Sequence, residues 1–460
     1  MRFHKWIQFF QHLSTTAVII MSFFVTILLG AFLLMLPISS ATGEVTPFVD
    51  ALFTATTSVC VTGLVVVTTA SHWSLFGHIV ILLLIQIGGL GVIAITTIAI
   101  LAMGRRVTLR DRMVLGDALN MDSLQGVVTF LKKVCKGTLL VETIGAVCYL
   151  FVFIPEYGIV RGIWYSVFHS VSAFCNAGID ILGDNSLIPY VNHLGMNVIT
   201  MSLIILGGLG FVVWWDVLDY IKTKARRFGS KDSSYCGLKL HTKIVLVMTF
   251  VLIVGGAVFY LIFEYHNEGT IGNMDLGEKV LASLFQSVTT RTAGFAAISQ
   301  KEMTSPSVIL SCVLMFIGGS SAGTAGGVKT GTVAVIILLV LATVKGQEDI
   351  ICFNRRISVK TAHKSVAVVL ISFLASVIAL ALMFLMESGA TSDIVFEVYS
   401  ALGTAGLSRD YTVTMGLAGK LIIIVCMFLG RIGPISMVIA FTMRSTQLPM
   451  RLPEDSVTVG

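Results

Sequence analysis

The sequence is poor in charged residues and in proline. Only 12% of its 460 residues are Asp, Glu, Lys or Arg, and 8 are proline, whereas a soluble domain has roughly 25% charged residues. In contrast, 55% of the residues are apolar, and no hydrophilic linker divides them into soluble cores. The shortage of charge excludes a water-soluble enzyme and indicates a protein that lies in a lipid bilayer.

Sequence motifs for catalysis, disulfides and metal binding are also absent. The 8 cysteines form no C-x-x-C pair and have no metal-type spacing with histidine, so we expect neither a disulfide framework nor a metal site. A membrane-embedded enzyme would need a base beside its nucleophile. The candidates His169, Ser320 and Ser321 come without H-E-x-x-H, G-x-S-x-G or an intramembrane acid pair. We therefore expect no enzyme activity and no cofactor.

Most of the 31 Lys and Arg residues lie in five short segments that alternate with long apolar spans. Loops on the cytoplasmic side of a membrane carry an excess of Lys and Arg, so we expect these segments and both termini to be cytoplasmic. This distribution also argues against a nucleic-acid partner, which the net charge of +6 alone would allow. The five segments are 1–7, 104–137, 222–243, 345–364 and 444–460.

The apolar spans form a fourfold repeat. They approach or exceed the roughly 20 residues needed to cross a bilayer, and they pair into hairpins between the basic segments. Each hairpin holds a shorter apolar stretch that ends in glycine, and its second span contains a break, glycine-rich in each case. The spans are 14–37, 73–103, 134–154, 191–221, 243–264, 307–344, 364–387 and 415–443. The predicted fold is an all-α membrane protein of four helix–pore loop–helix repeats around one pore, at residues 1–110, 111–230, 231–350 and 351–460.

The short stretches end at Gly63, Gly178, Gly294 and Gly406. They are too short to cross the hydrocarbon, so they must enter and turn back, and non-helical backbone survives at that depth only where it is buried in protein or lines water. Four such segments around one axis can line a pore with carbonyl oxygens, since glycine allows the positive φ that turns a carbonyl inward. The predicted filter residues are Val59, Cys60, Val61, Thr62, Gly63, Phe174, Cys175, Asn176, Ala177, Gly178, Thr290, Arg291, Thr292, Ala293, Gly294, Leu402, Gly403, Thr404, Ala405 and Gly406.

The charge of the transported ion follows from the helices before these segments. The C-terminal end of a helix carries a partial negative charge, so four short helices that end at the pore favour a cation. Carbonyl oxygens that replace a hydration shell suit a weakly hydrated monovalent ion such as K⁺.

The four segments, V-C-V-T-G-L, A-F-C-N-A-G, T-T-R-T-A-G-F and A-L-G-T-A-G-L, resemble the filter sequences of the Trk/Ktr/HKT superfamily of potassium transporters. Eight spans without an additional N-terminal pair are similar to the bacterial Ktr-type membrane subunit. The resemblance implies K⁺ transport, because glycine at the first filter position goes with K⁺ in this family and serine with Na⁺. A Na⁺ or unselective monovalent cation transporter of the same fold is the alternative.

The third repeat contains a glycine-rich loop inside its second apolar span. So many glycines in residues 318–331 will not hold a helix. A nucleotide-binding P-loop is excluded, because Val328 stands where that motif requires glycine directly before the lysine. The family resemblance implies that this intramembrane loop is a gate. Its predicted residues are Gly318, Gly319, Ser320, Ser321, Gly323, Thr324, Gly326, Gly327 and Lys329.

Arg431 is a charged residue in the middle of the eighth span. A buried cation in a membrane helix costs at least roughly 2.5–3.5 kcal/mol and usually marks function. The resemblance implies that Arg431 lies in the pore below the filter, near the gate loop. Arg291 is expected instead to hold filter carbonyls from behind by hydrogen bonds. Cys60 and Cys175 are expected to pack behind the filter as small side chains.

No soluble nucleotide-binding domain is recognisable in the sequence, and the cytoplasmic loops are short. The family resemblance therefore implies a homodimer docked on a separate cytosolic ring of nucleotide-binding regulatory subunits. It also implies a place in the bacterial plasma membrane, in contact with membrane lipids, with K⁺ as the transported ion rather than a bound cofactor.

Overall fold

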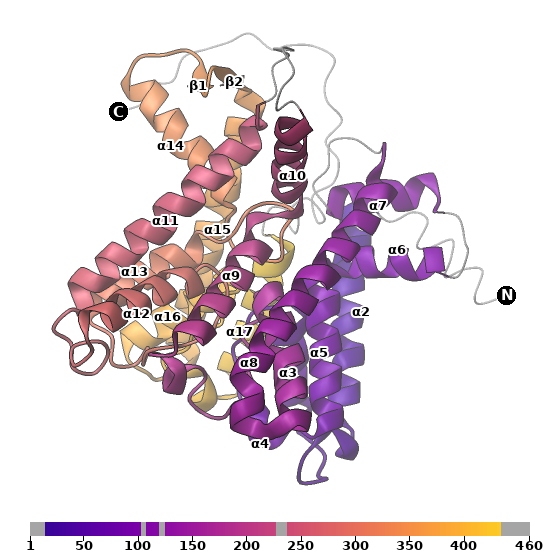
Figure 1. Ribbon diagram of the computed structural model, residues 1–460, viewed down its shortest axis with the longest axis vertical. Helices are drawn as coiled ribbons and strands as arrows, with labels where there is room; N and C mark the ends of the chain where they lie inside the picture. Colours follow the sequence, from indigo (N-terminus) through magenta and orange to yellow (C-terminus); the bar gives the residue numbers. More distant parts are fainter. Residues whose placement is uncertain (1–13, 103–106, 119–124, 227–236, 434–460) are drawn as a thin grey trace.

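The computed structural model describes residues 14–102, 107–118, 125–226 and 237–433. Both basic termini and the last part of the eighth predicted span, residues 434–443, lie outside the described residues. The described chain is a bundle in which most long helices run between the same two ends of the molecule (Figure 1). The elements α7, α10, β1 and β2 gather toward one end, and α4 lies at the opposite end.

The elements follow one another in a regular order. The first half contains α2 (Thr15–Met35), η1 (Pro37–Ser39), α3 (Phe48–Val59), α4 (Thr69–His72), α5 (Leu75–Leu90), α6 (Val92–Ala102), α7 (Leu109–Ala118), α8 (Val127–Cys175), η2 (Ile188–Tyr190), α9 (Leu194–Leu209) and α10 (Phe211–Arg226). The second half contains α11 (Leu240–Glu264), α12 (Leu276–Thr289), α13 (Ser305–Phe316), α14 (Thr330–Val344), β1 (Ile350–Cys352), β2 (Arg355–Ile357), α15 (Val359–Met386), α16 (Thr391–Gly403), η3 (Thr412–Thr414) and α17 (Leu417–Ile432).

Each predicted span corresponds to a helix or to a pair of helices. Among the described residues, α2, α8, α11 and α15 are individually long and apolar enough to cross a membrane. The bent pairs α5–α6 and α9–α10 raise this number from 4 to 6. The remaining two spans are α13 and α14, which flank the glycine-rich loop, and α17, which reaches the edge of the described residues.

The predicted glycine breaks are confirmed. Gly91 has φ 92° and Gly210 has φ 88°, a region that glycine enters without steric cost. The chain turns there by 99° between α5 and α6 and by 97° between α9 and α10. Gly433, at φ 91°, ends α17 in the same conformation. The spans 73–103 and 191–221 are therefore pairs of helices at nearly right angles rather than straight crossings.

Four short helical segments lie in the interior of the bundle. Three are the separate helices α3, α12 and α16, and the fourth is the part of α8 that follows Gly158. Gly158 has non-helical dihedrals, with φ 76° and ψ 174°, so α8 joins a crossing helix to a short one across a kink. Each short segment carries a fully buried phenylalanine that anchors it in the core; these are Phe53, Phe168, Phe285 and Phe396.

A small β-hairpin, β1–β2, is an addition to the predicted all-α fold. Its strands pair antiparallel, with Cys352 opposite Arg355. The two residues between them, Phe353 and Asn354, both have positive φ, of 47° and 58°. Such a two-residue turn matches the twist of a tight hairpin. The hairpin connects α14 to α15 at the end of the molecule where α10 lies (Figure 1).

Candidate ion filter and gate

The four predicted filter glycines meet around one axis. A methyl group on Gly63 would lie 3.1 Å from the Cα atom of Gly406 and 3.4 Å from that of Gly178. A methyl group on Gly294 would lie 3.1 Å from the Cα atom of Gly178 and 3.2 Å from that of Gly406. Segments more than a hundred residues apart in the sequence thus form a closed ring, in chain order, at the centre of the bundle.

The backbone of each segment repeats the same unusual conformation. All four glycines have positive φ, from 64° at Gly178 to 102° at Gly63. The residue two positions before each glycine also has positive φ, although none of these is glycine. These residues are Val61 (φ 54°), Asn176 (φ 60°), Thr292 (φ 67°) and Thr404 (φ 51°). Strained conformations of this kind cost of order 1–3 kcal/mol each and cluster at functional sites.

Hydroxyl groups at the ends of the short helices hold three of these segments. The amide of Gly63 donates to Thr57 Oγ1 at 2.9 Å. Ser172 Oγ donates to the Ile179 carbonyl at 2.6 Å, and Thr289 Oγ1 donates to the Phe295 carbonyl at 2.6 Å. These bonds join the last turn of each short helix to the chain at or just beyond the glycine. The segments are thereby fixed without using the carbonyls that precede the glycines.

The glycine-rich loop 318–331 docks on the bend between α9 and α10. The amides of Ser320 and Thr324 donate to the carbonyls of Gly208 and Gly207, at 2.9 and 3.2 Å. In the other direction, the amide of Phe211 donates to the Ala322 carbonyl at 2.8 Å. The loop therefore uses the carbonyls that the end of α9 leaves free of helical partners.

The same loop also touches two of the filter segments. Thr324 Oγ1 donates to the Phe174 carbonyl at 3.1 Å. A methyl group on Gly326 would lie 2.0 Å from Thr404 Oγ1, so at Gly326 only glycine fits against the fourth segment. The ends of the loop are closed by bonds from Gly318 to Val328 and from Thr330 to Gly319, at 2.9 and 3.0 Å. The loop therefore lies against the second and fourth filter segments, at residues that precede Gly178 and Gly406.

Arg431 ties the loop to the first repeat. Its Nη1 donates to the carbonyl of Thr324, in the loop, and its Nη2 donates to the carbonyl of Gly88 at the end of α5. A longer bond of 3.3 Å joins Nη2 to the Gly89 carbonyl. Within the loop, Lys329 Nζ donates to the Ala325 carbonyl at 2.7 Å. The structure thus brings Arg431 into contact with the loop, and its role in a gate stays a prediction.

Comparisons with known proteins agree with this geometry. The family model described as "TrkH: Cation transport protein" matches residues 1–449. The chain belongs to the TrkH family. Its sequence is 38% identical to the "Potassium/sodium uptake protein NtpJ" of Enterococcus hirae, over 98% of both chains. It is also 38% identical to the "Ktr system potassium uptake protein B" of Bacillus subtilis, over 99% of this chain and 98% of that one.

Solved structures give the same result for the fold. The potassium transporter TrkH of Vibrio parahaemolyticus superposes with a TM-score of 0.71 at 16% identity, over 93% of this chain and 84% of that one. The helix–pore loop–helix architecture is therefore the TrkH-family fold, and the prediction of fold and family from the filter sequences is confirmed.

A buried acid in this TrkH-family chain was missed by reasoning from the sequence. Glu142 lies in α8 behind the second filter segment and is 6% exposed. Its Oε1 is 3.8 Å from Cys175 Sγ, and its Oε2 accepts from Gln86 Nε2 at 3.3 Å. The available signal was a carboxylate within the apolar span 134–154, since ionisable residues inside a membrane are rare and functional. Cys175 itself is buried behind the segment, as predicted.

Arg291 and His169 are two buried residues whose contacts do not indicate a role in ion transport. Arg291 is buried beside the third segment, but its Nε has no hydrogen-bond partner among the described residues, so its bracing of filter carbonyls stays a prediction. His169 Nδ1 bonds to the Tyr165 carbonyl at 2.8 Å, and its ring packs 5.1 Å from that of Phe153. His169 is therefore a packing residue.

Proposed function

We propose that this chain transports K⁺ across the membrane through the ring formed by Gly63, Gly178, Gly294 and Gly406. The observation that carries the proposal is the ring itself, in which four segments with the same positive φ values converge. Backbone carbonyls in such a ring can replace the hydration shell of a monovalent cation. The four short helices end at the ring, so their negative ends add to the attraction.

K⁺ is the ion that the relatives favour. The Bacillus subtilis relative is named for potassium uptake, and the Enterococcus hirae relative is named for potassium and sodium. The second name keeps Na⁺ or unselective transport as the competing function. Glycine at position 63 supports K⁺ through the family resemblance, and the site has no room for a side chain, since a Cβ atom there would lie 2.6 Å from the Ala177 carbonyl.

We further propose that loop 318–331 and Arg431 form the gate. The loop lies against the second and fourth filter segments and is held by hydrogen bonds rather than by a continuous helix. Glycine has more backbone freedom than any other residue, so a glycine-rich segment of this kind can move while α13 and α14 stay in place. Arg431 places a positive charge beside the loop, in the proposed path of the ion. This charge would repel K⁺ while the loop is in place.

The assembly and its orientation complete the proposal. The chain would form a homodimer in the bacterial plasma membrane, with both termini in the cytoplasm and a separate cytosolic regulatory ring. The name "Ktr system" of the relatives is consistent with a protein of several components. The helix α10 and the β1–β2 hairpin, which carries Arg355 and Arg356, lie toward one end of the bundle (Figure 1), and this supports the orientation.

Uptake of ⁸⁶Rb⁺ into proteoliposomes tests the proposal. The purified chain should take up ⁸⁶Rb⁺, and external K⁺ should compete with it more strongly than external Na⁺. Repeating the assay with and without a Na⁺ gradient separates simple K⁺ conduction from Na⁺ coupling. Equal competition by K⁺ and Na⁺ would favour the unselective alternative, and an absence of uptake by folded protein would reject the proposal.

A further inference from the structure

Glu142 is a buried acid whose partners are all neutral. Gln86 Nε2 donates to its Oε2 at 3.3 Å, and Cys175 Sγ lies 3.8 Å from its Oε1 and 4.0 Å from Gln86 Oε1. None of the ion pairs in the described part of the chain includes Glu142. A Cβ atom on Gly89 would lie 2.5 Å from Cys175 Sγ, so the thiol is enclosed between α5 and Glu142. An ionisable residue inside a membrane span usually marks function.

The third repeat shows what the fold itself requires at the position of Glu142. In both repeats a serine of the short helix donates to the backbone carbonyl at this position, Ser170 to Glu142 at 2.6 Å and Ser287 to Ile253 at 2.7 Å. In both repeats a tyrosine seven residues later bonds to a hydroxyl group of the next span. These tyrosines are Tyr149 and Tyr260. The fold therefore accepts an isoleucine where the second repeat has the acid.

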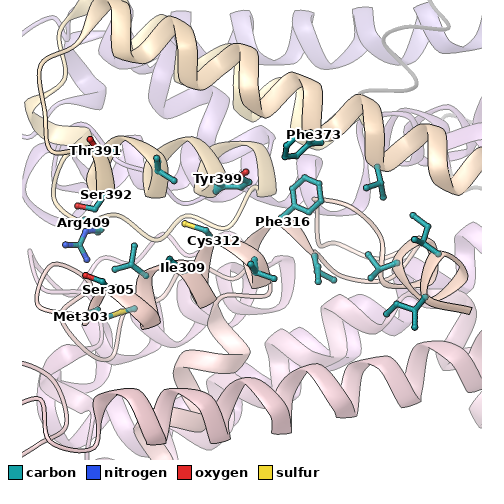
Figure 2. Close-up of a pocket in the computed structure, with 18 residues that line it drawn as sticks. Met303, Ser305, Ile309, Cys312, Phe316, Phe373, Thr391, Ser392, Tyr399 and Arg409 are labelled. Atoms are coloured by element: carbon teal, nitrogen blue, oxygen red, sulfur yellow. The ribbon is translucent and has the colours of Figure 1, made fainter. Parts of the chain in front are cut away.

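Gln86 also has apolar counterparts. It stands two residues before a pair of glycines near the end of α5, and the residues at the same place in the second and third repeats are Ile205 and Phe316. The ring of Phe316 lies 6.2 Å from that of Tyr399, and Figure 2 shows Phe316 beside Phe373 in an apolar part of the groove that they line. Packing between repeats therefore does not require a polar pair at this place.

The polar pair adjoins the filter segment to which the glycine-rich loop donates. Thr324 Oγ1 donates to the carbonyl of Phe174 at 3.1 Å. Cys175 is the next residue and the last of α8, and Asn176 after it has the positive φ of 60°. The loop thus holds Phe174, and Glu142 holds Cys175, directly before the residue with the strained backbone.

We propose that Glu142 is a positioning residue that sets the K⁺/Na⁺ selectivity of the second filter segment through its contact with Cys175. The thiol is a weak donor to the carboxyl oxygen, and Gln86 fixes that carboxyl group from α5. Without this contact the segment gains freedom, and its carbonyls can approach an ion smaller than K⁺. The proposal rests on the proposed function, because it assumes that the ring conducts K⁺.

Replacing Glu142 by the residue of the third repeat tests the proposal. Glu142→Ile introduces a side chain that the fold already accepts at Ile253, but it leaves Cys175 and Gln86 without their partner. We expect the ratio of K⁺ to Na⁺ flux in proteoliposomes to fall by about tenfold. Glu142→Gln keeps a carbonyl oxygen for the thiol and should stay within about twofold of the wild type. Thr143→Ile, on the exposed side of α8, is the matched control and should leave the ratio unchanged.

The S–H stretching band of Cys175 gives a second measurement that does not depend on flux. The band is assigned in infrared spectra of the purified chain by its loss in Cys175→Ala. A hydrogen-bonded thiol absorbs at a lower frequency than a free one. The band should therefore move to a higher frequency in Glu142→Ile and stay near its wild-type position in Glu142→Gln.

Three results would overturn the role of Glu142. They are a wild-type flux ratio in folded Glu142→Ile, an S–H band that this substitution does not move, and an equal loss of selectivity in Glu142→Gln. Gly63→Ser in the same assay separates this role from the proposed function. If Gly63→Ser lowers the ratio and Glu142→Ile does not, the role of Glu142 alone is wrong. If the purified chain takes up no ion, the proposed function is rejected, and the S–H band then decides whether Glu142 holds Cys175.

Discussion

Arg431 is a single side chain that contacts two repeats. Its planar fork reaches the carbonyls of Thr324 in the loop and of Gly88 in α5. In the proposed gate it combines two effects, a charge in the path of the ion and a bridge that holds the loop. A unit charge at about 8 Å from K⁺ contributes roughly 2 kcal/mol at an effective dielectric constant near 20.

The two effects can be separated by substitution. Arg431→Ala should raise ⁸⁶Rb⁺ flux by about tenfold, since it removes both. Arg431→Lys keeps the charge but lacks the fork, so we expect a flux between those of the wild type and of Arg431→Ala. Arg431→Gln, which keeps a donor without charge, gives a third point in the same assay. A lysine variant that matches the wild type would show that charge alone matters, and three variants at wild-type flux would remove Arg431 from the gate.

The positive φ values in the four filter segments could be predicted from the sequence only in part. Gly63 and its three counterparts could be predicted, because glycine is the residue that adopts φ > 0 freely. Val61 and Thr404 could not, since a β-branched residue rarely takes that conformation. Its cause is the closure of the ring, in which four segments constrain one another, and no single segment contains that information.

At the scale of elements, the proposed gate loop 318–331 is held by a close contact at Gly326. A methyl group on Gly326 would collide with Thr404 Oγ1, whereas one on Gly331, at the start of α14, would meet nothing within 4 Å. Gly326→Ala should therefore push the loop away from the fourth segment. We expect it to raise the ⁸⁶Rb⁺ flux of the purified chain by about tenfold. Gly331→Ala is the control and should leave flux unchanged in the same assay. If Gly326→Ala folds and conducts like the wild type, the loop is not the barrier.

The order of the elements followed from spacing, but their angles did not. Hydropathy located the eight spans, and the glycine runs located the breaks at Gly91 and Gly210. The turn of 97° lies at Gly210, where the loop of the third repeat docks, and the turn of 99° lies at Gly91, just after the two carbonyls to which Arg431 of the fourth repeat donates; both contacts come from another repeat. The hairpin β1–β2 was missed for a different reason: its strands are three residues each, too short for a clear alternation.

For the whole molecule, the orientation in the membrane is a prediction that cysteine labelling can check. Val45, between α2 and α3, is 61% exposed, and Ile351, on the β1–β2 hairpin, is 58% exposed. If the basic segments are cytoplasmic, Val45→Cys should react with a membrane-impermeant maleimide in intact cells. Ile351→Cys should react only after the cells are permeabilised. The reverse pattern would invert the proposed orientation.

The central claim is that the ring of four glycines selects K⁺. The most direct test is the ratio of K⁺ to Na⁺ flux in proteoliposomes for Gly63→Ser and Gly406→Ser, compared with Gly43→Ser. Gly43 also has positive φ, at 75°, but nothing lies within 4 Å of its added Cβ atom, whereas the Cβ atom of residue 406 would meet the Thr62 carbonyl at 2.0 Å. We predict that both ring variants lose about tenfold in the flux ratio, or ~1.4 kcal/mol of discrimination, and that Gly43→Ser keeps it. An unchanged K⁺/Na⁺ ratio in folded Gly63→Ser and Gly406→Ser would contradict the assignment of the filter.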